Sequence, residues 1–235
     1  MRPPDAEPPE ATPVARAIGV TRRFDSASGS VLAVDGVDVE VPRHLLTVIA
    51  GPSGSGKSTL LGLLACLDRP DVGEVWLDRI ETTPLSRRQR RHLRRDRIGI
   101  VLPQPSDNLL DRLDAGGNLA WAARQRGSTA ARTGDQRAEI LSAVGLADLA
   151  AKGVRQLSGG EQQRLALACA IVGDPLLVVA DEPTASLDRA SADRVVDVLR
   201  AAADRGVTLV VAGHDRRVID AADRVVELDH GRRVS

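Results

Sequence analysis

The sequence predicts an α/β fold with a parallel sheet, a small antiparallel β subdomain and a helical insertion subdomain. Strand-like and helical segments alternate from Ala15 to the end of the chain, which is the pattern of an α/β domain. Three of the strand-like segments are unbroken apolar runs, as buried parallel strands are. Residues 17–41 combine strand-like stretches with polar turns, which indicates a hairpin or meander, and about 104–172 is helical and rich in loops.

The expected elements follow one another in a regular order. The strands are expected at Ala17–Phe24, Val31–Val41, Leu45–Ala50, Glu74–Leu77, Ile98–Leu102, Leu176–Asp181, Val207–Ala212 and Arg224–Leu228. The helices are expected at Ser58–Leu67, Ser86–Asp96, Gly117–Arg126, Asp135–Val144, Gly160–Val172, Arg189–Asp204 and Arg217–Ala221. Residues 1–14 are Pro-rich and polar and are expected to be a disordered arm, which leaves 15–235 as the folded domain.

The composition is that of an ordinary soluble protein, with 43% hydrophobic and 27% charged residues. The 32 basic and 32 acidic residues cancel, which argues against nucleic-acid binding through bulk charge, and one Phe and two Trp are too few for stacking platforms. The apolar runs are shorter than the roughly 18 residues that span a bilayer. The first ten residues, MRPPDAEPPE, lack the apolar segment of a signal peptide. We therefore expect a cytoplasmic chain.

A glycine-rich loop follows the expected strand Leu45–Ala50 and leads directly into a helix. Its residues, GPSGSGKST, fit the pattern G-x-x-x-x-G-K-[ST] of nucleotide phosphate binding. Glycines let successive N–H groups point at one anion, and the helix start adds the positive end of its dipole. Lys57 is expected to contact the β- and γ-phosphates of ATP, and Ser58 to bind Mg²⁺. The candidate phosphate-binding residues are Gly51, Ser53, Gly54, Ser55, Gly56, Lys57, Ser58 and Thr59.

Two adjacent carboxylates, Asp181 and Glu182, end a later apolar strand. Neighbouring residues on a strand point to opposite sides, so the two carboxylates can take different roles. We assign Asp181 to the Mg²⁺ site and Glu182 to general-base catalysis on the attacking water. Taken alone, such a strand end is more often structural. The glycine-rich loop upstream is what favours catalysis.

The segment Leu157–Arg164 reads LSGGEQQR. Its serine precedes two glycines at a helix start, which exposes N–H groups as a second anion site. One ATP hardly needs two such sites from the same chain. Here the sequence resembles the ABC-type ATP-binding subunits over nearly its whole length. The resemblance implies an ABC ATPase fold and a head-to-tail dimer, in which Ser158, Gly159 and Gly160 of one copy face the ATP held by Lys57 of the other.

Three further residues match the same family. Asp188 ends the segment ASLD, which matches the loop that crosses the dimer interface. His214 follows the apolar strand VTLVVAG and matches the histidine that contacts the γ-phosphate. Phe24 matches the aromatic residue that stacks on adenine. A lone His is as often structural, so the position of His214 after this strand carries its assignment, whereas Phe24 is the only Phe of the chain.

One loop departs from the family pattern. The family usually reads IGxVFQ, whereas residues 98–104 read IGIVLPQ and place Pro103 where the glutamine is expected. One alternative is that the loop shifts by one residue, so that Gln104 contacts the catalytic water and Mg²⁺. The other is that this amide is missing, and that hydrolysis is then slow or differently coupled.

Residues 67–78 and the arginine-rich segment 85–97 resemble the lipoprotein-release and macrolide-efflux branch of the family. The resemblance implies two partners, a second copy of the chain and a separately encoded transmembrane permease, and a place on the cytoplasmic face of the membrane through that permease. No nucleic-acid partner is expected. Residues 105–117 are expected to carry partner specificity.

Several alternatives stay open. The seven arginines of 87–97 form either a solvated helical face or a contact with lipid headgroups or the permease. Three other functions compete with transport, namely a soluble ABC-type ATPase acting on ribosomes or DNA, a nucleotide-binding regulator with little turnover, and mechanical transmission through the membrane without a transported substrate. A soluble ATPase of the ribosome or DNA type usually needs two ATPase units in tandem, whereas this chain has one set of motifs. The regulator is motivated only by Pro103.

Overall fold

The computed structural model of the chain describes residues 12–26 and 29–234. The expected disordered arm falls mostly on residues 1–11, which lie outside the described residues. Val14, which the sequence assigns to this arm, is fully buried, and its N–H donates to the carbonyl oxygen of Val41 at 2.8 Å. The boundary expected after residue 14 is therefore too late by at least one residue, because the apolar Val14 side chain packs into the core around the first sheet.

The strands of the described part form two sheets. In chain order they are β1 (Ala15–Ser26), β2 (Gly29–Val41), β3 (Leu46–Ala50), β4 (Val72–Leu77), β5 (Ile80–Glu81), β6 (Ile98–Val101), β7 (Leu177–Asp181), β8 (Leu209–Gly213), β9 (Arg224–Asp229) and β10 (Arg232–Arg233). The smaller sheet is antiparallel and has the order β2-β1-β4-β5. The larger has the order β10-β9-β3-β8-β7-β6 and is parallel except for β10. Both the parallel sheet and the antiparallel subdomain predicted from the sequence are present.

The helices lie where the sequence predicts them, within two or three residues at each end. They are α1 (Lys57–Leu64), α2 (Arg87–Arg97), α3 (Ala115–Gln125), α4 (Gly134–Ala143), α5 (Gly159–Ile171), α6 (Arg189–Asp204) and α7 (Arg216–Asp220). Capping boxes begin α2, α4 and α5, in which the side chains of Ser86, Thr133 and Ser158 accept hydrogen bonds from the third residue of the helix. Short 3₁₀ turns at Pro105–Asn108, Ala147–Leu149 and Val154–Gln156 connect the helices of the insertion.

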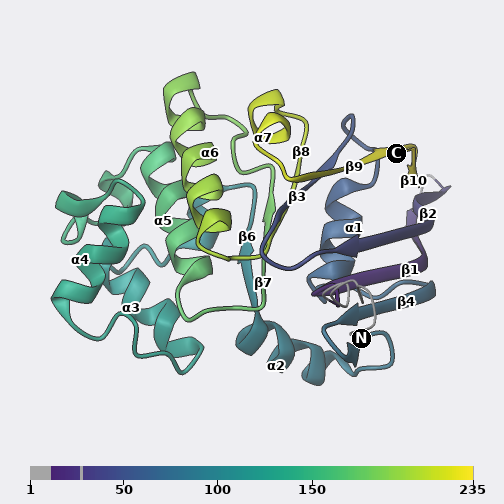
Figure 1. The fold of residues 1–235 in the computed structure, drawn as a ribbon, viewed down its shortest axis with the longest axis horizontal. Coiled ribbons are helices and arrows are strands. Elements are labelled where there is room, and N and C mark those ends of the chain that lie inside the picture. Colours follow the sequence, from purple (N-terminus) through teal and green to yellow (C-terminus); the bar gives the residue numbers. More distant parts are fainter. Residues whose placement is uncertain (1–11, 27–28, 235) are drawn as a thin grey trace, which may run out of the picture.

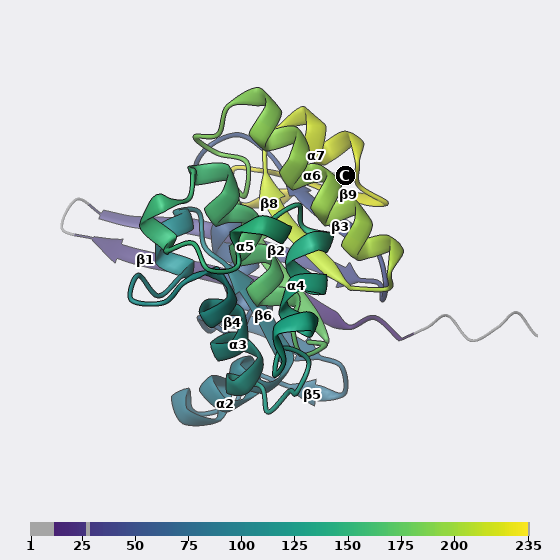
Figure 2. The ribbon, with the colours of Figure 1, turned by 90° about the vertical axis from the view of Figure 1, so that its left-hand side faces the viewer.

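The parallel sheet separates two hydrophobic cores. Its side chains alternate between the faces, so Val48 and Val178 pack towards α5 and α6, whereas Ile49 and Val179 pack towards α1 and the antiparallel sheet. Figure 1 shows α1 and the antiparallel sheet on one side of this layer and α3 to α6 on the other, and Figure 2 looks onto the helical side. The helices α1 and α5 therefore begin on opposite faces of the sheet.

Arg126 ties the helical insertion to the edge of the sheet. Its guanidinium donates to the carbonyl oxygens of Ile98 at 3.3 Å, Cys169 at 3.0 Å and Val172 at 3.2 Å, which joins the end of α3 to β6 and to the end of α5. Burial lowers the pKa of this guanidinium. Across residues 12–26 and 29–234, no helix combines the length and the apolar character needed to cross a membrane.

Candidate active site

The carboxyl ends of four parallel strands meet at one edge of the sheet. Ala50 of β3 pairs with Gly213 of β8, and Ala180 of β7 pairs with Val101 of β6. The loops that leave these strands therefore start side by side, at the edge where open α/β sheets bind their ligands. They carry the candidate residues Gly51 to Thr59, Gln104, Glu182 and His214.

Two glycines hold the glycine-rich loop against the strands behind it. Gly51 has a φ of 151° and Gly56 a φ of 99°, values that other residues adopt only with strain. A Cβ atom on Gly51 would lie 2.2 Å from the carbonyl oxygen of Leu228, and one on Gly56 would lie 2.2 Å from that of Ala33. The loop is also held by the N–H of Gly231, which donates to the carbonyl oxygen of Ser55 at 3.1 Å. The sequence thus uses glycine where β2 and β9 leave no room for a side chain.

The Lys57 side chain points into this loop and is only 5% exposed. Its Nζ donates to the carbonyl oxygens of Gly51 and Pro52, both at 2.9 Å, and lies 3.7 Å from Oε1 of Glu182. A buried ammonium group needs such partners, and phosphate oxygens can take their place. Among the described residues, the buried Ser55 Oγ has no hydrogen-bond partner. The buried ammonium group of Lys57 and the unpartnered hydroxyl of Ser55 therefore fit a loop that binds a triphosphate.

Asp181 and Ser58 lie next to Lys57 at the helix start. The Ser58 hydroxyl donates to Oδ1 of Asp181 at 3.0 Å. Burial raises the pKa of the Asp181 carboxyl, an effect that the Ser58 hydrogen bond opposes and the charge of Glu182 reinforces. A divalent cation would offset this cost of a buried negative charge. The two oxygen ligands therefore fit Mg²⁺.

The protein offers Mg²⁺ only part of its coordination shell. Within 12–26 and 29–234, no three His, Cys, Asp or Glu side chains gather into a group that could hold a metal ion. Mg²⁺ characteristically uses one or two protein oxygens together with substrate phosphates and water. The Ser58 and Asp181 pair has this character, which ties the metal to the nucleotide.

Glu182 lies at the centre of the site. Nδ1 of His214 lies 3.1 Å from its Oε1, on the carboxylate oxygen that also faces Lys57. Glu182 has a φ of 45°, which is strained for a residue with a side chain and turns it away from the line of β7. Such strain is found where the position of a side chain matters more than its stability. The sequence predicts Glu182 and His214 separately, and the structure brings them into contact.

The serine–glycine segment forms a second group, on the helical side of the sheet. The Ser158 side chain caps α5 by accepting a hydrogen bond from the Glu161 N–H. The Glu161 carboxylate in turn accepts a hydrogen bond from the Ser158 N–H at 2.7 Å. A Cβ atom on Gly160 would lie 2.7 Å from that of Ser191, so only glycine lets α5 approach the start of α6. Asp188 caps α6, its Oδ1 accepting from the Ser191 N–H at 3.0 Å. Ser158 and Asp188 thus begin two helices that pack together, and no contact found among the described residues joins Ser158 to Lys57.

Gln104 lies at the correct edge of the sheet but outside the cluster around Glu182. Its side chain is exposed and forms no hydrogen bond within the described part of the chain. Asn108 holds the loop instead, because its side chain accepts from the N–H of Leu102 at 2.7 Å and donates to the carbonyl oxygen of Gln104 at 3.0 Å. The structure therefore places Gln104 near the site without a contact to Asp181 or Glu182.

Phe24 presents a ring supported by a residue that the sequence analysis missed. The Phe24 side chain is 43% exposed on β1, and the guanidinium carbon of Arg22 lies 4.6 Å from its ring centre. Arg22 is fixed by Asp68 and Asp71, each at 2.8 Å, in the loop that follows α1. The spacing of two residues in a strand, which puts Arg22 and Phe24 on one face, is the signal that could have found it.

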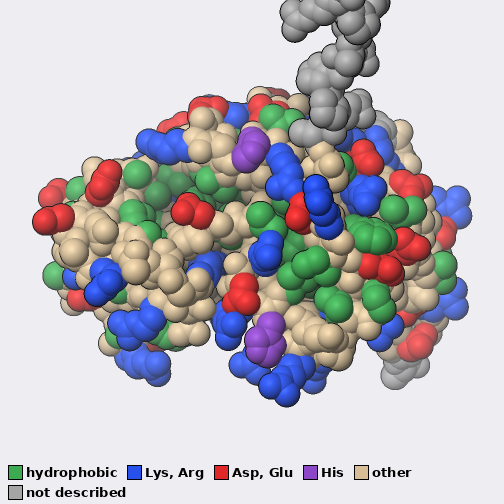
Figure 3. Space-filling model, turned by 60° about the horizontal axis from the view of Figure 1, so that its bottom comes forward, with side chains coloured by type: hydrophobic (Ala, Val, Ile, Leu, Met, Phe, Trp, Pro, Cys, Tyr) green, Lys and Arg blue, Asp and Glu red, His purple; other side chains and the backbone are tan. Residues whose placement is uncertain are grey.

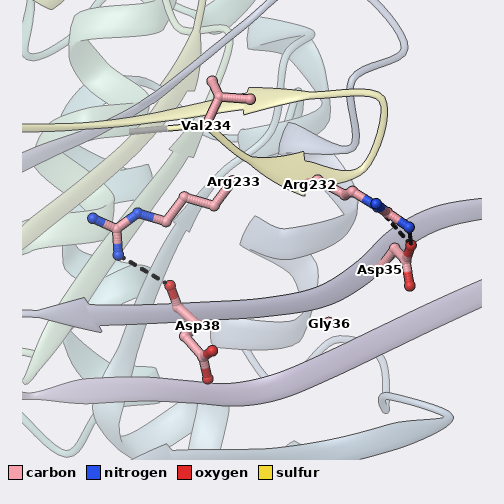
Figure 4. A pocket seen from close by; sticks show the side chains of 6 residues that line it. All are labelled: Asp35, Gly36, Asp38, Arg232, Arg233 and Val234. Carbon is pink, nitrogen blue, oxygen red and sulfur yellow. Dashed lines mark hydrogen bonds and ion pairs between the residues drawn. The ribbon is translucent and has the colours of Figure 1, made fainter.

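A hollow of about 610 Å³ lies away from these residues, between β2 and β10. Figure 4 shows that its charged side chains are already engaged, with Arg232 paired to Asp35 and Arg233 donating to the carbonyl oxygen of Asp38. Its lining contains none of the candidate nucleotide-binding residues. We therefore assign this hollow no part in ATP binding.

Comparison with known proteins gives a consistent result. The model of the family described as "ABC transporter" matches residues 34–185. The lipoprotein-releasing system ATP-binding protein LolD of Hyphomonas neptunium is 35% identical over 94% of this chain and 96% of its own length. The macrolide export ATP-binding/permease protein MacB of Agrobacterium fabrum is 34% identical over 93% of this chain. The chain spans only 34% of that relative.

A solved structure shares the fold. The ATP-binding cassette MJ0796, in a dimeric post-hydrolysis state bound to ADP and Pi, superposes with a TM-score of 0.83 at 32% identity, over 94% of this chain and 97% of its own. Together with the glycine-rich loop and the cluster of Lys57, Glu182 and His214, these similarities show that the chain belongs to the ABC transporter family, as an ATP-hydrolysing cassette.

Proposed function

We propose that this chain is the ATP-binding and hydrolysing subunit of an ABC transporter, and that it works as a dimer on a separate permease. The contact between Lys57, Glu182 and His214 at the glycine-rich loop carries the proposal. A separate permease is supported by LolD, which is named an ATP-binding protein and which this chain matches over 96% of its length. The name of MacB, by contrast, joins an ATP-binding part and a permease in one protein.

The residues of the site divide the chemistry between them. Lys57, Ser55 and the N–H groups of the loop hold the phosphates, while Ser58 and Asp181 hold Mg²⁺, which supplies positive charge to the phosphate oxygens. Glu182 accepts a proton from the attacking water. The oxygen of that water bonds to the γ-phosphorus while the bond between the γ-phosphorus and the oxygen that bridges it to the β-phosphate breaks. His214 orients the Glu182 carboxylate and contacts the γ-phosphate.

The placement of the two anion sites supports the proposed dimer. Ser158 and Lys57 begin helices on opposite faces of the parallel sheet, and no contact among the described residues joins them. A second copy that turns its Ser158, Gly159 and Gly160 towards this glycine-rich loop completes the site. Asp188, at the start of α6 beside Gly160, would then lie in the interface.

Gln104 is proposed to contact the water and Mg²⁺ once the nucleotide is bound. Two observations support this role: its loop leaves the edge of the sheet next to β7, and its side chain makes no competing hydrogen bond in the described residues. Pro103 stiffens the loop by fixing one backbone torsion. The shift of one residue predicted from the sequence remains a proposal.

Replacing Phe24 with alanine is expected to weaken ATP binding about tenfold, because stacking of a base on an aromatic ring contributes ~1–3 kcal/mol. Arg22→Gln is expected to weaken ATP binding by a smaller factor, since it removes the support of the ring but leaves the ring itself. Calorimetric titration measures both. Inorganic tripolyphosphate is the control, because it lacks a base and should bind both variants as it binds the unmodified chain. Equal losses for ATP and tripolyphosphate would contradict the role of Phe24.

The partner is proposed to dock in a groove of about 270 Å³ between β6, α3 and α5. Trp121, which is 41% exposed, and Ile100 line this groove, and the 3₁₀ turn at Pro105–Asn108 borders it through Asn108. The tagged chain should co-purify from detergent-solubilised membranes with a multi-span protein, and Trp121→Asp should lose that protein while it still binds ATP. Recovery with ribosomes or DNA, and with no membrane protein, would contradict the transport function.

A further inference from the structure

The helix α2 carries an unusual concentration of positive charge. Seven of its eleven residues are arginine and one is aspartate, and none of the eleven is buried. Within the described residues, the only ion pair that these arginines form joins Arg95 to its neighbour Asp96. The charge is therefore not neutralised by the rest of the chain.

Four of these arginines form one stripe. At about 100° per residue, Arg87, Arg88, Arg91 and Arg95 fall within an arc of about 100° on the helix, and all four are exposed. We call them the arginine stripe. The opposite side of α2 faces the protein, where Leu93 packs against the core that contains α1. Arg94, at the margin of the stripe, donates to the carbonyl oxygen of Cys66. The stripe is therefore directed away from the protein.

The arginines of α2 repel one another, which indicates a function outside the fold. Arginines four residues apart, such as Arg87, Arg91 and Arg95, are neighbours on the helix and destabilise it. Partial burial lowers the pKa of Arg94, and the charges of Arg90, Arg91 and Arg87 lower it further although the thiol of Cys66 opposes them. The helix begins with the capping box at Ser86 but has no buried side chain to compensate. A surface of negative charge would relieve this repulsion.

The stripe borders the groove proposed for the membrane partner. Arg95 and Trp121 line the same groove, so the end of α2 and the exposed indole of α3 lie on one face. Figure 1 places α2 at the lower edge of the molecule, and Figure 3, which turns this edge forward, shows basic side chains spread over the face, with a group of them at its lower margin. Docking of a membrane protein in this groove would bring the stripe towards the bilayer.

We propose that the arginine stripe binds the anionic lipid headgroups of the bilayer around the permease. This inference rests on the proposed function, since the permease is what brings the chain to the membrane. Clusters of four or more basic side chains on one helix face bind anionic membranes, because each adds attraction to the negative surface. Arginine also forms paired hydrogen bonds with lipid phosphates. The lipid contact would orient the cassette beside its partner.

Vesicle flotation of the purified full chain tests this proposal without any permease. The unmodified chain should bind vesicles of phosphatidylcholine mixed with phosphatidylglycerol at least about tenfold more strongly than vesicles of phosphatidylcholine alone. High salt should abolish the difference because it screens exposed charges. Replacement of all four stripe arginines with glutamine should remove the preference and leave ATP hydrolysis unchanged.

A matched variant controls for net charge. It replaces four exposed arginines on other elements with glutamine, at positions 79, 132, 205 and 216, and should retain the preference for phosphatidylglycerol. Equal binding of both vesicle types by the unmodified chain overturns the proposal, as does an unchanged preference in the stripe variant. If the unmodified chain does not hydrolyse ATP at all, the proposed function is contradicted instead. Failure of the lipid proposal and failure of the proposed function are therefore distinguishable.

Discussion

Glu182→Gln is expected to lower ATP hydrolysis by at least about a hundredfold, because it removes the group that accepts the proton of the attacking water. ATP binding should become tighter at the same time. Oε1 of Glu182 lies 3.7 Å from the buried Nζ of Lys57, so the carboxylate competes with the phosphates for this cation and repels them. The amide keeps the shape and loses the charge. Phosphate release and calorimetric titration measure the two effects separately.

The same substitution should trap an ATP-bound dimer. A site that binds ATP without hydrolysing it stays closed, so size-exclusion chromatography with MgATP should show the dimer of Glu182→Gln, and the monomer when ATP is left out. Glu227→Gln is the matched control, since Glu227 is exposed on β9 and shares no contact with the cluster. Phosphate release from Glu182→Gln at the rate of the unmodified chain would refute the assignment of the base.

The parts of the site that the sequence predicts are those built from consecutive residues. The glycine-rich loop, the apolar strands and the helix starts each depend on a local pattern, and the structure contains each of them within a few residues. The two strands that were missed, β5 and β10, have two residues each, which is too short for any alternation to show. Local pattern therefore accounts for most of the fold.

The contacts between the motifs depend on the register of the sheet, which no local pattern contains. Lys57 meets Glu182 because β3, β7 and β8 end together at one edge, although the two residues are far apart in the chain. The sequence places Gln104 one residue after the position of the family's glutamine. It does not indicate that the side chain of Asn108, and not that of Gln104, holds this loop. The sequence also contains Arg22, but it does not show that Asp68 and Asp71 form ion pairs with Arg22 and hold it over the Phe24 ring.

Mixing two inactive variants is expected to restore hydrolysis. Lys57→Met removes the cation from the glycine-rich loop at similar side-chain volume, and Ser158→Asp keeps a good helix cap but places a negative charge where the phosphate binds. Each variant alone should hydrolyse ATP at a few per cent or less of the unmodified rate, on the order of the loss expected for a missing phosphate contact.

In an equal mixture, half of the dimers contain one copy of each variant, and each of these has one site in which both the lysine and the serine are intact. If the two sites act independently, about a quarter of the unmodified activity should return, as expected for a head-to-tail interface between two copies. A chain with both substitutions, mixed with either single variant, restores no intact site and should stay inactive. If the first mixture also stays inactive while dimers form, Ser158 does not act on the ATP of its partner. Recovery occurs only if α1 of one copy and α5 of the other close on the same nucleotide, and their placement on opposite faces of the sheet is compatible with this arrangement.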